Sequence, residues 1–330
     1  IYDASVGQLK YGLLSGPLNL SGTNYGDYIY WNTDLSPPAW TVGNTQVSIG
    51  SLAGSFSQGQ YAIALGTGAG YIDQTGNAIA IGYNAGNINQ GEYAIALGYL
   101  TGEFNQGLNS VAIGNASGVF SQDQNAIAIG TNAGYTGQIG NAVAIGNTSG
   151  QFSQGANAIA VGVLAGNINQ QTNSVAIGNS AGQNTQGQYA VAIGNSAGQT
   201  NQGPYNIAIG YLAGQSFQAI TSTAGTCSIA IGNGAGQSSQ QINSIAIGLQ
   251  SGQNSQNQNA VAIGYQAGQN TQGFDSVAIG NNAGQNTQGQ ECIAIGTQSG
   301  ENNQAQNSVA LGYQAGQNSQ GVGATGGTST

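Results

Sequence analysis

The sequence predicts an all-β fold, a parallel β-solenoid (β-roll) of about 17 coils with 16 residues per coil, and three regularities predict it. A short segment, typified by Asn77–Gly82 (NAIAIG), returns every 16 residues. A second glycine, such as Gly86, stands four residues after the glycine that closes each copy, and an unvarying glutamine, such as Gln90, follows four residues later. The closing glycines are Gly50, Gly66, Gly82, Gly98, Gly114, Gly130, Gly146, Gly162, Gly178, Gly194, Gly210, Gly232, Gly248, Gly264, Gly280, Gly296 and Gly312.

The repeated segment has the pattern of a β-strand. Branched residues alternate with alanine, as in Ile79–Ile81, so an extended chain puts the two kinds on opposite faces. A helix would carry a glycine in every turn, at a cost of about 1 kcal/mol each. Residues 83–86 and 91–93 have the composition of turns, and residues 87–90 are long enough for a second strand. We therefore expect one circuit per unit, with circuits stacked in parallel about 4.8 Å apart.

The alternation raises the question of which face lies inside the coil. Burial of branched side chains yields the larger free energy, so we expect the isoleucines to form the interior. This predicted structural core is Ile79, Ile81, Ile95, Ile113, Ile127, Ile129, Ile145, Ile177, Ile193, Ile209, Ile263 and Ile295. Small side chains let another sheet approach closely, so we expect the alanine face to pack against partner chains. This predicted contact face is Ala80, Ala96, Ala112, Ala128, Ala144, Ala176, Ala192 and Ala262.

The invariant glutamines predict a ladder of side-chain amides, because identical amides stacked in register hydrogen-bond along the coil axis. The predicted ladder includes Gln58, Gln74, Gln90, Gln106, Gln186, Gln202, Gln272 and Gln288. Two residues before each glutamine, the side chain is mostly Phe or Ile up to Ile168 and mostly Asn from Asn184 onward. If this position points inward, the second half carries an asparagine ladder. If it points toward a neighbouring chain, the first half offers that chain the more apolar surface.

Composition excludes several classes of partner. The 330 residues contain one lysine, no histidine and ten acidic residues, with a net charge of −9. Without cations beyond Lys10 to neutralise phosphates, we expect no nucleic-acid partner. No apolar run approaches the roughly 20 residues that cross a bilayer as a helix, so we expect no membrane insertion. An amide-rich, nearly uncharged surface suits a rigid rod in an extracellular or virion-surface location.

The ends of the chain and one internal step depart from the repeat. Residues 1–45 hold Tyr28, Tyr30, Trp31 and Trp40 and predict a small β cap, which is either a lid on the first coil or an end-docking element. Residues 46–320 form the repeat array. Within it, residues 218–228 contain six extra residues, which predict an outward loop. Residues 321–330 predict a flexible Gly/Thr tail.

The chain has few residues that carry chemistry. A lone lysine and the absence of histidine remove most general bases, and the carboxylates are scattered, so we expect no enzyme activity, catalytic residue, cofactor or metal. Glu291 and Glu301 are the one carboxylate pair worth naming. Cys227 and Cys292 lie four coils apart, about 19 Å along the rod and too far for an intrachain disulfide, so both are expected to be packing residues.

The segments Asn109–Gly114 (NSVAIG), Asn173–Gly178 (NSVAIG) and Asn307–Gly312 (NSVALG) resemble the head repeat of the YadA-like trimeric autotransporter adhesins. Similar repeats occur in fibre proteins of giant viruses and phages. The resemblance covers the repeat array and implies left-handed β-rolls associated as a homotrimer, with the alanine face as the trimer face. The unit in this chain is longer than the repeat typical of the adhesins.

These observations together predict a structural fibre protein, a rigid trimeric rod exposed on a virion or cell surface. Its expected partner is itself, and the sequence leaves end-to-end assembly into filaments open. The first alternative is a host-binding adhesin that recognises a surface glycan or receptor. The second is an ice-binding β-roll, although Thr185, Thr271 and Thr287 alternate with Ser and Asn rather than forming a regular row.

Overall fold

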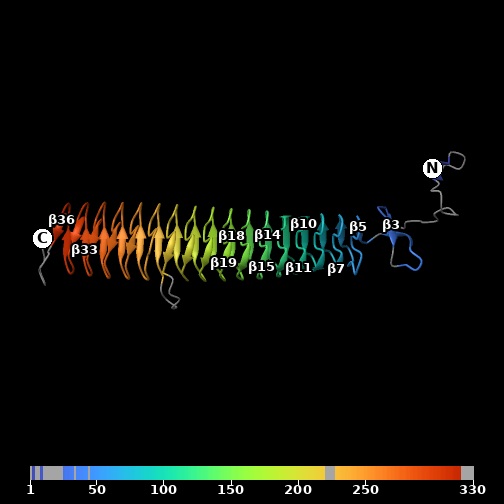
Figure 1. Ribbon diagram of the computed structural model, residues 1–330, viewed down its shortest axis with the longest axis horizontal. Helices are drawn as coiled ribbons and strands as arrows, with labels where there is room; N and C mark the ends of the chain where they lie inside the picture. Colours follow the sequence, from blue (N-terminus) through green and yellow to red (C-terminus); the bar gives the residue numbers. More distant parts are fainter. Residues whose placement is uncertain are drawn as a thin grey trace.

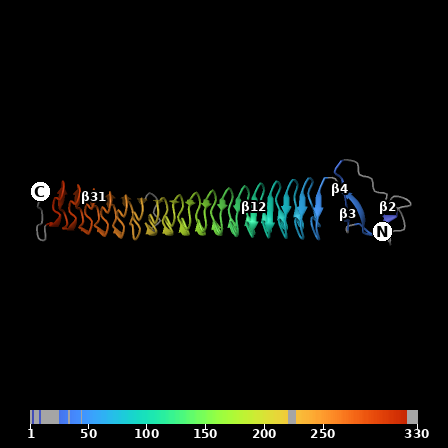
Figure 2. The same cartoon turned by 90° about the horizontal axis from the view of Figure 1, so that it is seen from above.

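The computed structural model describes residues 2–3, 8–9, 25–32, 35–43, 45–219 and 227–320. All regular structure in these residues is β, and the repeat array forms a long, straight rod (Figures 1 and 2). The predicted parallel β-solenoid of about 17 coils with 16 residues per coil is confirmed. The predicted tail at 321–330 and the loop residues 220–226 lie outside the described residues.

The first sheet contains the Ile-Ala-Ile strands, one from each coil. Consecutive strands pair in parallel and in register, so that Ile79 lies opposite Ile63 on one side and Ile95 on the other. The register is kept across the insertion, where Ile207 lies opposite Ile229. Its strands are β5 (Val47–Ile49), β6 (Ile63–Leu65), β8 (Ile79–Ile81), β10 (Ile95–Tyr99), β12 (Val111–Asn115), β14 (Ile127–Ile129), β16 (Val143–Ile145), β18 (Ile159–Val161), β20 (Val175–Ile177), β22 (Val191–Ile193), β24 (Ile207–Ile209), β26 (Ile229–Ile231), β27 (Ile245–Ile247), β29 (Val261–Ile263), β31 (Val277–Ile279), β33 (Ile293–Ile295) and β35 (Val309–Leu311).

The second sheet contains the short strands that end in the invariant glutamine. It is divided into a ten-stranded and a five-stranded part, which isolated bridges from Ser216 to Ser238 and from Gln240 to Gln256 connect. Its strands are β7 (Ile72–Gln74), β9 (Ile88–Gln90), β11 (Phe104–Gln106), β13 (Phe120–Gln122), β15 (Thr136–Gln138), β17 (Phe152–Gln154), β19 (Ile168–Gln170), β21 (Asn184–Gln186), β23 (Thr200–Gln202), β25 (Ser216–Gln218), β28 (Ser255–Gln256), β30 (Thr271–Gln272), β32 (Thr287–Gln288), β34 (Asn302–Gln304) and β36 (Asn318–Gln320).

Two hairpins precede the array. Strands β1 (Tyr2–Asp3) and β2 (Gln8–Leu9) form an antiparallel pair. Strands β3 (Tyr28–Asn32) and β4 (Ala39–Gly43) form a second pair, which lies beyond β5 at the N-terminal end of the rod (Figure 1). In this second hairpin Trp31 is directly opposite Trp40.

The corner between the two sheets depends on two glycines. Gly82 has φ 129°, and a Cβ there would overlap the backbone carbonyl group of Gly98 in the next coil. Gly86 has φ 51°, and a Cβ there would lie 2.6 Å from the side-chain carbon Cδ of Gln90. Both glycines are therefore required by close approach as well as by backbone conformation.

The prediction of which face lies inside was wrong. The alanines at the middle of the first-sheet strands have no exposed surface, whereas the flanking aliphatic side chains are half-buried or exposed. The expected contact face is therefore in the interior: Ala80, Ala96, Ala112, Ala128, Ala144, Ala176, Ala192 and Ala262. The expected core side chains are on the outer surface: Ile79, Ile81, Ile95, Ile113, Ile127, Ile129, Ile145, Ile177, Ile193, Ile209, Ile263 and Ile295.

The width of the coil explains this inversion. Opposite each buried alanine, the second sheet turns its glutamine inward, and the amide Nε2 of Gln90 donates to the carbonyl O of Ile79 at 2.8 Å across the interior. The glutamine and two or three small side chains, such as Ala78, Ala80 and Ala85, fill the coil. A branched side chain pointing inward would occupy the place of the amide, so the sheet exposes its Ile face instead.

Candidate functional site

The aliphatic face is an apolar surface that runs the length of the repeat array. It consists of two rows of Ile, Val and Leu on the outer side of the first sheet, with two side chains in each strand from β5 to β35. Because the strands pair in register, Ile113, Ile129 and Ile145 follow one another directly in one row. None of the side chains in the two rows is buried. This face would extend for about 80 Å at the usual strand spacing.

The inner glutamine ladder is defined here as the column of inward-facing glutamines from Gln58 to Gln304. Each amide Nε2 typically donates to a carbonyl in the first sheet and to Oε1 of the glutamine in the next coil, as Gln74 does to Ile63 O at 2.8 Å and to Gln90 Oε1 at 3.0 Å. The hydrogen bonds expected from stacked amides are therefore present at the predicted positions. The ladder members named from the sequence are Gln58, Gln74, Gln90, Gln106, Gln186, Gln202, Gln272 and Gln288.

The ladder has one weak step. Nε2 of Gln272 donates to Val261 O at 2.6 Å and to Ser276 O at 3.4 Å. The buried Oε1 of Gln288, which is the acceptor of the next rung, has no hydrogen-bond partner. The ladder is thus continuous on both sides of this step but not across it.

The start of the ladder explains the one copy of the repeat that lacks alanine at the centre of its strand. Gln58 has no preceding rung to donate to its Oε1, and the hydroxyl of Ser48 donates to that atom at 2.6 Å. In the sequence, Ser48 stands where every other copy of the repeat has alanine. The signal was the exception itself, because it falls in the first coil.

Tyr28 closes the edge of β5. Its hydroxyl donates to the carbonyl O of Gln46 at 2.5 Å and accepts from the amide N of Ser48 at 3.0 Å. These contacts occupy backbone groups that a preceding coil would otherwise pair. Burial raises the pKa of the Tyr28 hydroxyl. The sequence left two interpretations of the cap, a lid on the first coil or an end-docking element. The contacts of Tyr28 with Gln46 and Ser48 support the lid.

The other face of the second hairpin is apolar and exposed. Trp31 and Trp40 pack edge to face with ring centroids 5.4 Å apart, and 50% and 41% of their surfaces remain exposed. Tyr30 lies on the same face as Tyr28, with ring centroids 5.9 Å apart. The four predicted end-docking residues therefore divide between the two faces of one hairpin, and Tyr28 contacts the first coil.

The outer side of the second sheet changes along the rod. In the first half it carries aromatic and aliphatic side chains, including Phe104 and Phe120, whose rings stack 5.3 Å apart. In the second half it carries asparagines, and Asn254 donates to Asn270 at 2.8 Å. The position two residues before the glutamine points outward throughout, so the first half is the apolar one and the second half has an exposed asparagine ladder.

A further column of amides lies beside this ladder and is called here the outer glutamine column. Its members are joined by hydrogen bonds close to 3.0 Å between successive coils, and they are partly buried. They are Gln183, Gln199, Gln215, Gln237, Gln253, Gln269 and Gln285. Near its C-terminal end, Gln317 donates to the carboxylate of Glu301 at 2.7 Å.

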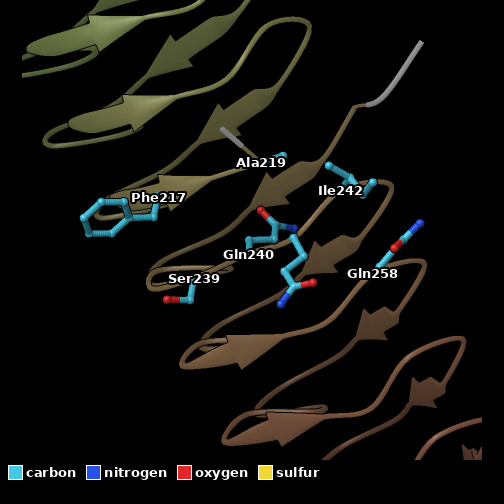
Figure 3. A pocket seen from close by; sticks show the side chains of 7 residues that line it. Phe217, Ala219, Ser239, Gln240, Ile242 and Gln258 are labelled. Carbon is cyan, nitrogen blue, oxygen red and sulfur yellow. The ribbon is translucent and has the colours of Figure 1, made fainter. Parts of the chain in front are cut away.

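The insertion is closed at its base by a residue that sequence reasoning missed. Asn206 is fully buried and stands where the other coils after the first have Ala, Ser or Cys. Its Nδ2 donates to Gln218 O at 2.8 Å, and its Oδ1 accepts from the amide N of Ser228 at 2.8 Å. Beside this base lies an open hollow lined by Phe217, Ile242 and neighbouring polar residues (Figure 3).

Clusters of titratable side chains are scarce in the part of the chain that the structure describes. No group of three or more His, Cys, Asp or Glu residues within this part is placed to hold a metal ion. Cys292 is buried and contacts Ala305 O through its Sγ, as expected for a packing residue, but Cys227 is exposed, so that part of the expectation was wrong. Burial raises the pKa of Glu103, although a hydrogen bond with Asn84 opposes this shift. None of the elements described is a helix suited to crossing a membrane.

The comparison with known families agrees with this geometry. Residues 106–133 match the model of the YadA head domain repeat, in two copies. No curated protein and no solved structure matches the chain. The coils on either side of the match have the same strands, register and inner glutamine as the matched residues. The rod is thus a β-solenoid in which residues 106–133 match the YadA head domain repeat.

Proposed function

We propose that the chain is a structural, non-enzymatic rod that associates as a homotrimer through its aliphatic face and serves as a fibre on a cell or virion surface. The observation that carries this proposal is the pair of continuous, outward rows of Ile, Val and Leu, which have two side chains in every coil. The match to the YadA head domain repeat supports it, since that repeat fits a trimeric adhesin or fibre.

The energetics favour covering this face. Burial of the remaining surface of a half-exposed Ile or Val in an interface contributes about 1 kcal/mol to the free energy of association. The face has two such side chains in every coil. A strip about 80 Å long can bury more than the roughly 1,000 Å² that a specific interface needs. A single copy would leave this strip in water, which is unusual for a soluble monomer.

Substitutions that place charges on the aliphatic face test whether this face forms the trimer interface. We expect the triple variant Ile113→Asp, Ile129→Asp and Ile145→Asp to be monomeric by light scattering, because each buried carboxylate would cost several kcal/mol. Circular dichroism checks that it stays folded. The matched control is Phe120→Asp, Thr136→Asp and Phe152→Asp, which places the same charges outward on the second sheet of neighbouring coils.

The two variants separate the possible outcomes. If wild type and control are trimers and the Ile variant is not, the aliphatic face is the interface. A trimer in all three would show that another face is used. A monomeric wild type would refute the trimer itself, and electron microscopy of the purified chain would show the same as single thin rods.

A host-binding adhesin is the second candidate, and the aromatic side chains on the outer second sheet favour it. Phe104 and Phe120 are stacked, and Tyr135 packs edge to face on Phe120 at 5.5 Å between ring centroids. Aromatic surfaces of this kind supply contact area for a glycan or a protein receptor. Glycan-array binding that is lost in the Phe120→Asp, Thr136→Asp and Phe152→Asp variant would establish it.

The ice-binding alternative has the weakest support. The outward column that contains Thr271 and Thr287 also contains Ser255, Phe217 and Asn303, so the rod lacks a regular threonine row there. The absence of thermal hysteresis in a solution of the purified protein would remove this candidate.

A further inference from the structure

The insertion between β25 and β26 interrupts neither the first sheet nor the inner glutamine ladder. On the first sheet, Ile207 pairs with Ile229 across it. In the interior, Nε2 of Gln218 donates to Oε1 of Gln240 at 3.0 Å, just as successive glutamines do in regular coils. The register of the first sheet and of the inner ladder is therefore the same on both sides of the insertion.

The second turn of this coil is held by a side chain from the preceding coil. In many regular coils the amide N at the end of the turn donates to a carbonyl three residues earlier, as Ala190 N does to Gly187 O at 3.2 Å and Ala94 N to Gly91 O at 3.1 Å. In the coil with the insertion, the corresponding amide is that of Ser228. It donates instead to the side-chain Oδ1 of Asn206 at 2.8 Å.

Asn206 also holds the other end of the insertion. Its Nδ2 donates to Gln218 O at 2.8 Å and lies 3.4 Å from Ala219 O, on the chain that leaves the coil. One buried amide in the preceding coil thus bridges the departing and returning strands. The base of the insertion, with Ala219 and Gln240, is visible in Figure 3.

We propose that the coil from Gly210 to Gly232 is a dedicated loop-bearing coil, and that Asn206 is the residue that makes it compatible with the rod. The amide replaces a backbone carbonyl that the insertion has displaced, so the loop between residues 219 and 227 is free to vary in length and sequence. The same residue has no such role in a regular coil. The inference does not depend on the oligomeric state of the rod.

A double-mutant cycle tests this directly. Deleting residues 220–225 restores the regular step of the repeat. In the native background, Asn206→Ala should lower the hydrogen-exchange protection of amides in β24 and β26 by about tenfold or more. The buried amide of Ser228 loses its acceptor, and Gln218 O keeps only the hydrogen bond from Gly203 N. In the deletion background the same substitution should change protection by less than about twofold, since Ala is what regular coils use.

Two further variants make the cycle decisive. Ala190→Asn places the same amide in a regular coil and should lower protection there, because its turn is already closed by a backbone hydrogen bond. If the deletion variant does not fold, a version with six added Gly and Ser residues in the loop replaces it. That version should keep wild-type protection, and Asn206→Ala should still cost about tenfold in it.

Two results would overturn the proposal. One is an equal loss of protection for Asn206→Ala with and without the insertion, which would make Asn206 an ordinary packing residue. The other is no loss in the native background, which would mean that the bridge contributes nothing to holding the loop. Loss of protection in the lengthened-loop protein itself would contradict the claim that the loop length is free.

Discussion

Ser48 illustrates how a single side chain can complete a repeated structure. Its hydroxyl supplies the hydrogen bond that Gln58 Oε1 would receive from a preceding rung. Every other coil has alanine at this position, and nearly every later glutamine accepts instead from the coil before it. The residue that departs from the repeat is therefore the one that the first coil requires.

Replacing Ser48 by the residue that all other coils use should destabilise the protein. We expect Ser48→Ala to cost about 1 kcal/mol locally, because the Gln58 carbonyl loses its donor. Hydrogen exchange of amides in β5 and β6 would measure this cost. The control is Ala64→Ser in the second coil, which should bring no gain because Gln74 Oε1 already accepts from Gln58 at 3.2 Å. Equal behaviour of the two variants would contradict this role.

The inner glutamine ladder determines the strength of each coil at the level of elements. Nε2 of Gln138 donates to Ile127 O at 2.7 Å and to Gln154 Oε1 at 3.1 Å, and its Oε1 accepts from Gln122 at 3.2 Å. One side chain thus joins the two sheets and contacts both neighbouring rungs.

Gln138→Leu should therefore weaken three successive coils rather than one. The variant keeps the approximate volume of the side chain but leaves buried amides and carbonyls without partners, at about 1–3 kcal/mol for each group. Thermal unfolding and hydrogen exchange would report the loss. Gln215→Leu in the partly buried outer glutamine column is the matched control and should cost less, because water can replace its partners. A comparable loss in both would refute the special role of the inner ladder.

Glu103 should make the stability of its coil depend on pH. Burial raises its pKa in the folded chain, so folding disfavours the ionised form. The folded state then binds more protons than the unfolded state between the ordinary and the raised pKa, and stability falls as pH rises through that range. Hydrogen exchange in β11 should show more protection at about pH 4 than at neutral pH. Glu103→Gln should remove the difference, and its persistence would assign it to another group.

The whole rod depends on how its N-terminal end is closed. Tyr28 hydrogen-bonds to Gln46 and Ser48, so the second hairpin covers the edge of β5. Uncovered strand edges are templates for pairing with another chain. The hairpin is thus expected to prevent coil-on-coil joining of rods at this end.

Deleting residues 1–43 should expose that edge and cause rods to associate end to end. Electron microscopy would show lengths that are multiples of the single rod, whereas the full chain should give one length. Tyr28→Phe retains the hairpin but loses the hydroxyl, and it should leave the rod length unchanged while lowering hydrogen-exchange protection in β5. Unchanged length after the deletion would show that the hairpin does not control assembly.

Much of this architecture follows from the sequence, and the failures have a common cause. The period, the strand positions and the amide ladder follow from regular spacing alone. The identity of the inner face does not follow from the sequence. The alternation in Ile79–Ile81 places Ile and Ala on opposite faces of the strand but does not show which face is buried. The deciding fact was the width set by Gln90 reaching Ile79 O, which is a distance between elements. Asn206 was missed for a similar reason, since its partners lie in the next coil.

The direction of the glutamine amides has a consequence for the electrical character of the rod. In the inner glutamine ladder, each N–H points to the following coil, as from Gln74 to Gln90, so the small amide dipoles add along the axis. In the outer glutamine column the bonds run the other way, as from Gln199 to Gln183. The two sets oppose each other only beyond Gln183. From Asn254 to Asn318 the exposed asparagine ladder points the same way as the inner glutamine ladder, so the outer column opposes two sets of amides there and does not cancel them. A molecule with few charged side chains thus has a net amide dipole directed along its axis.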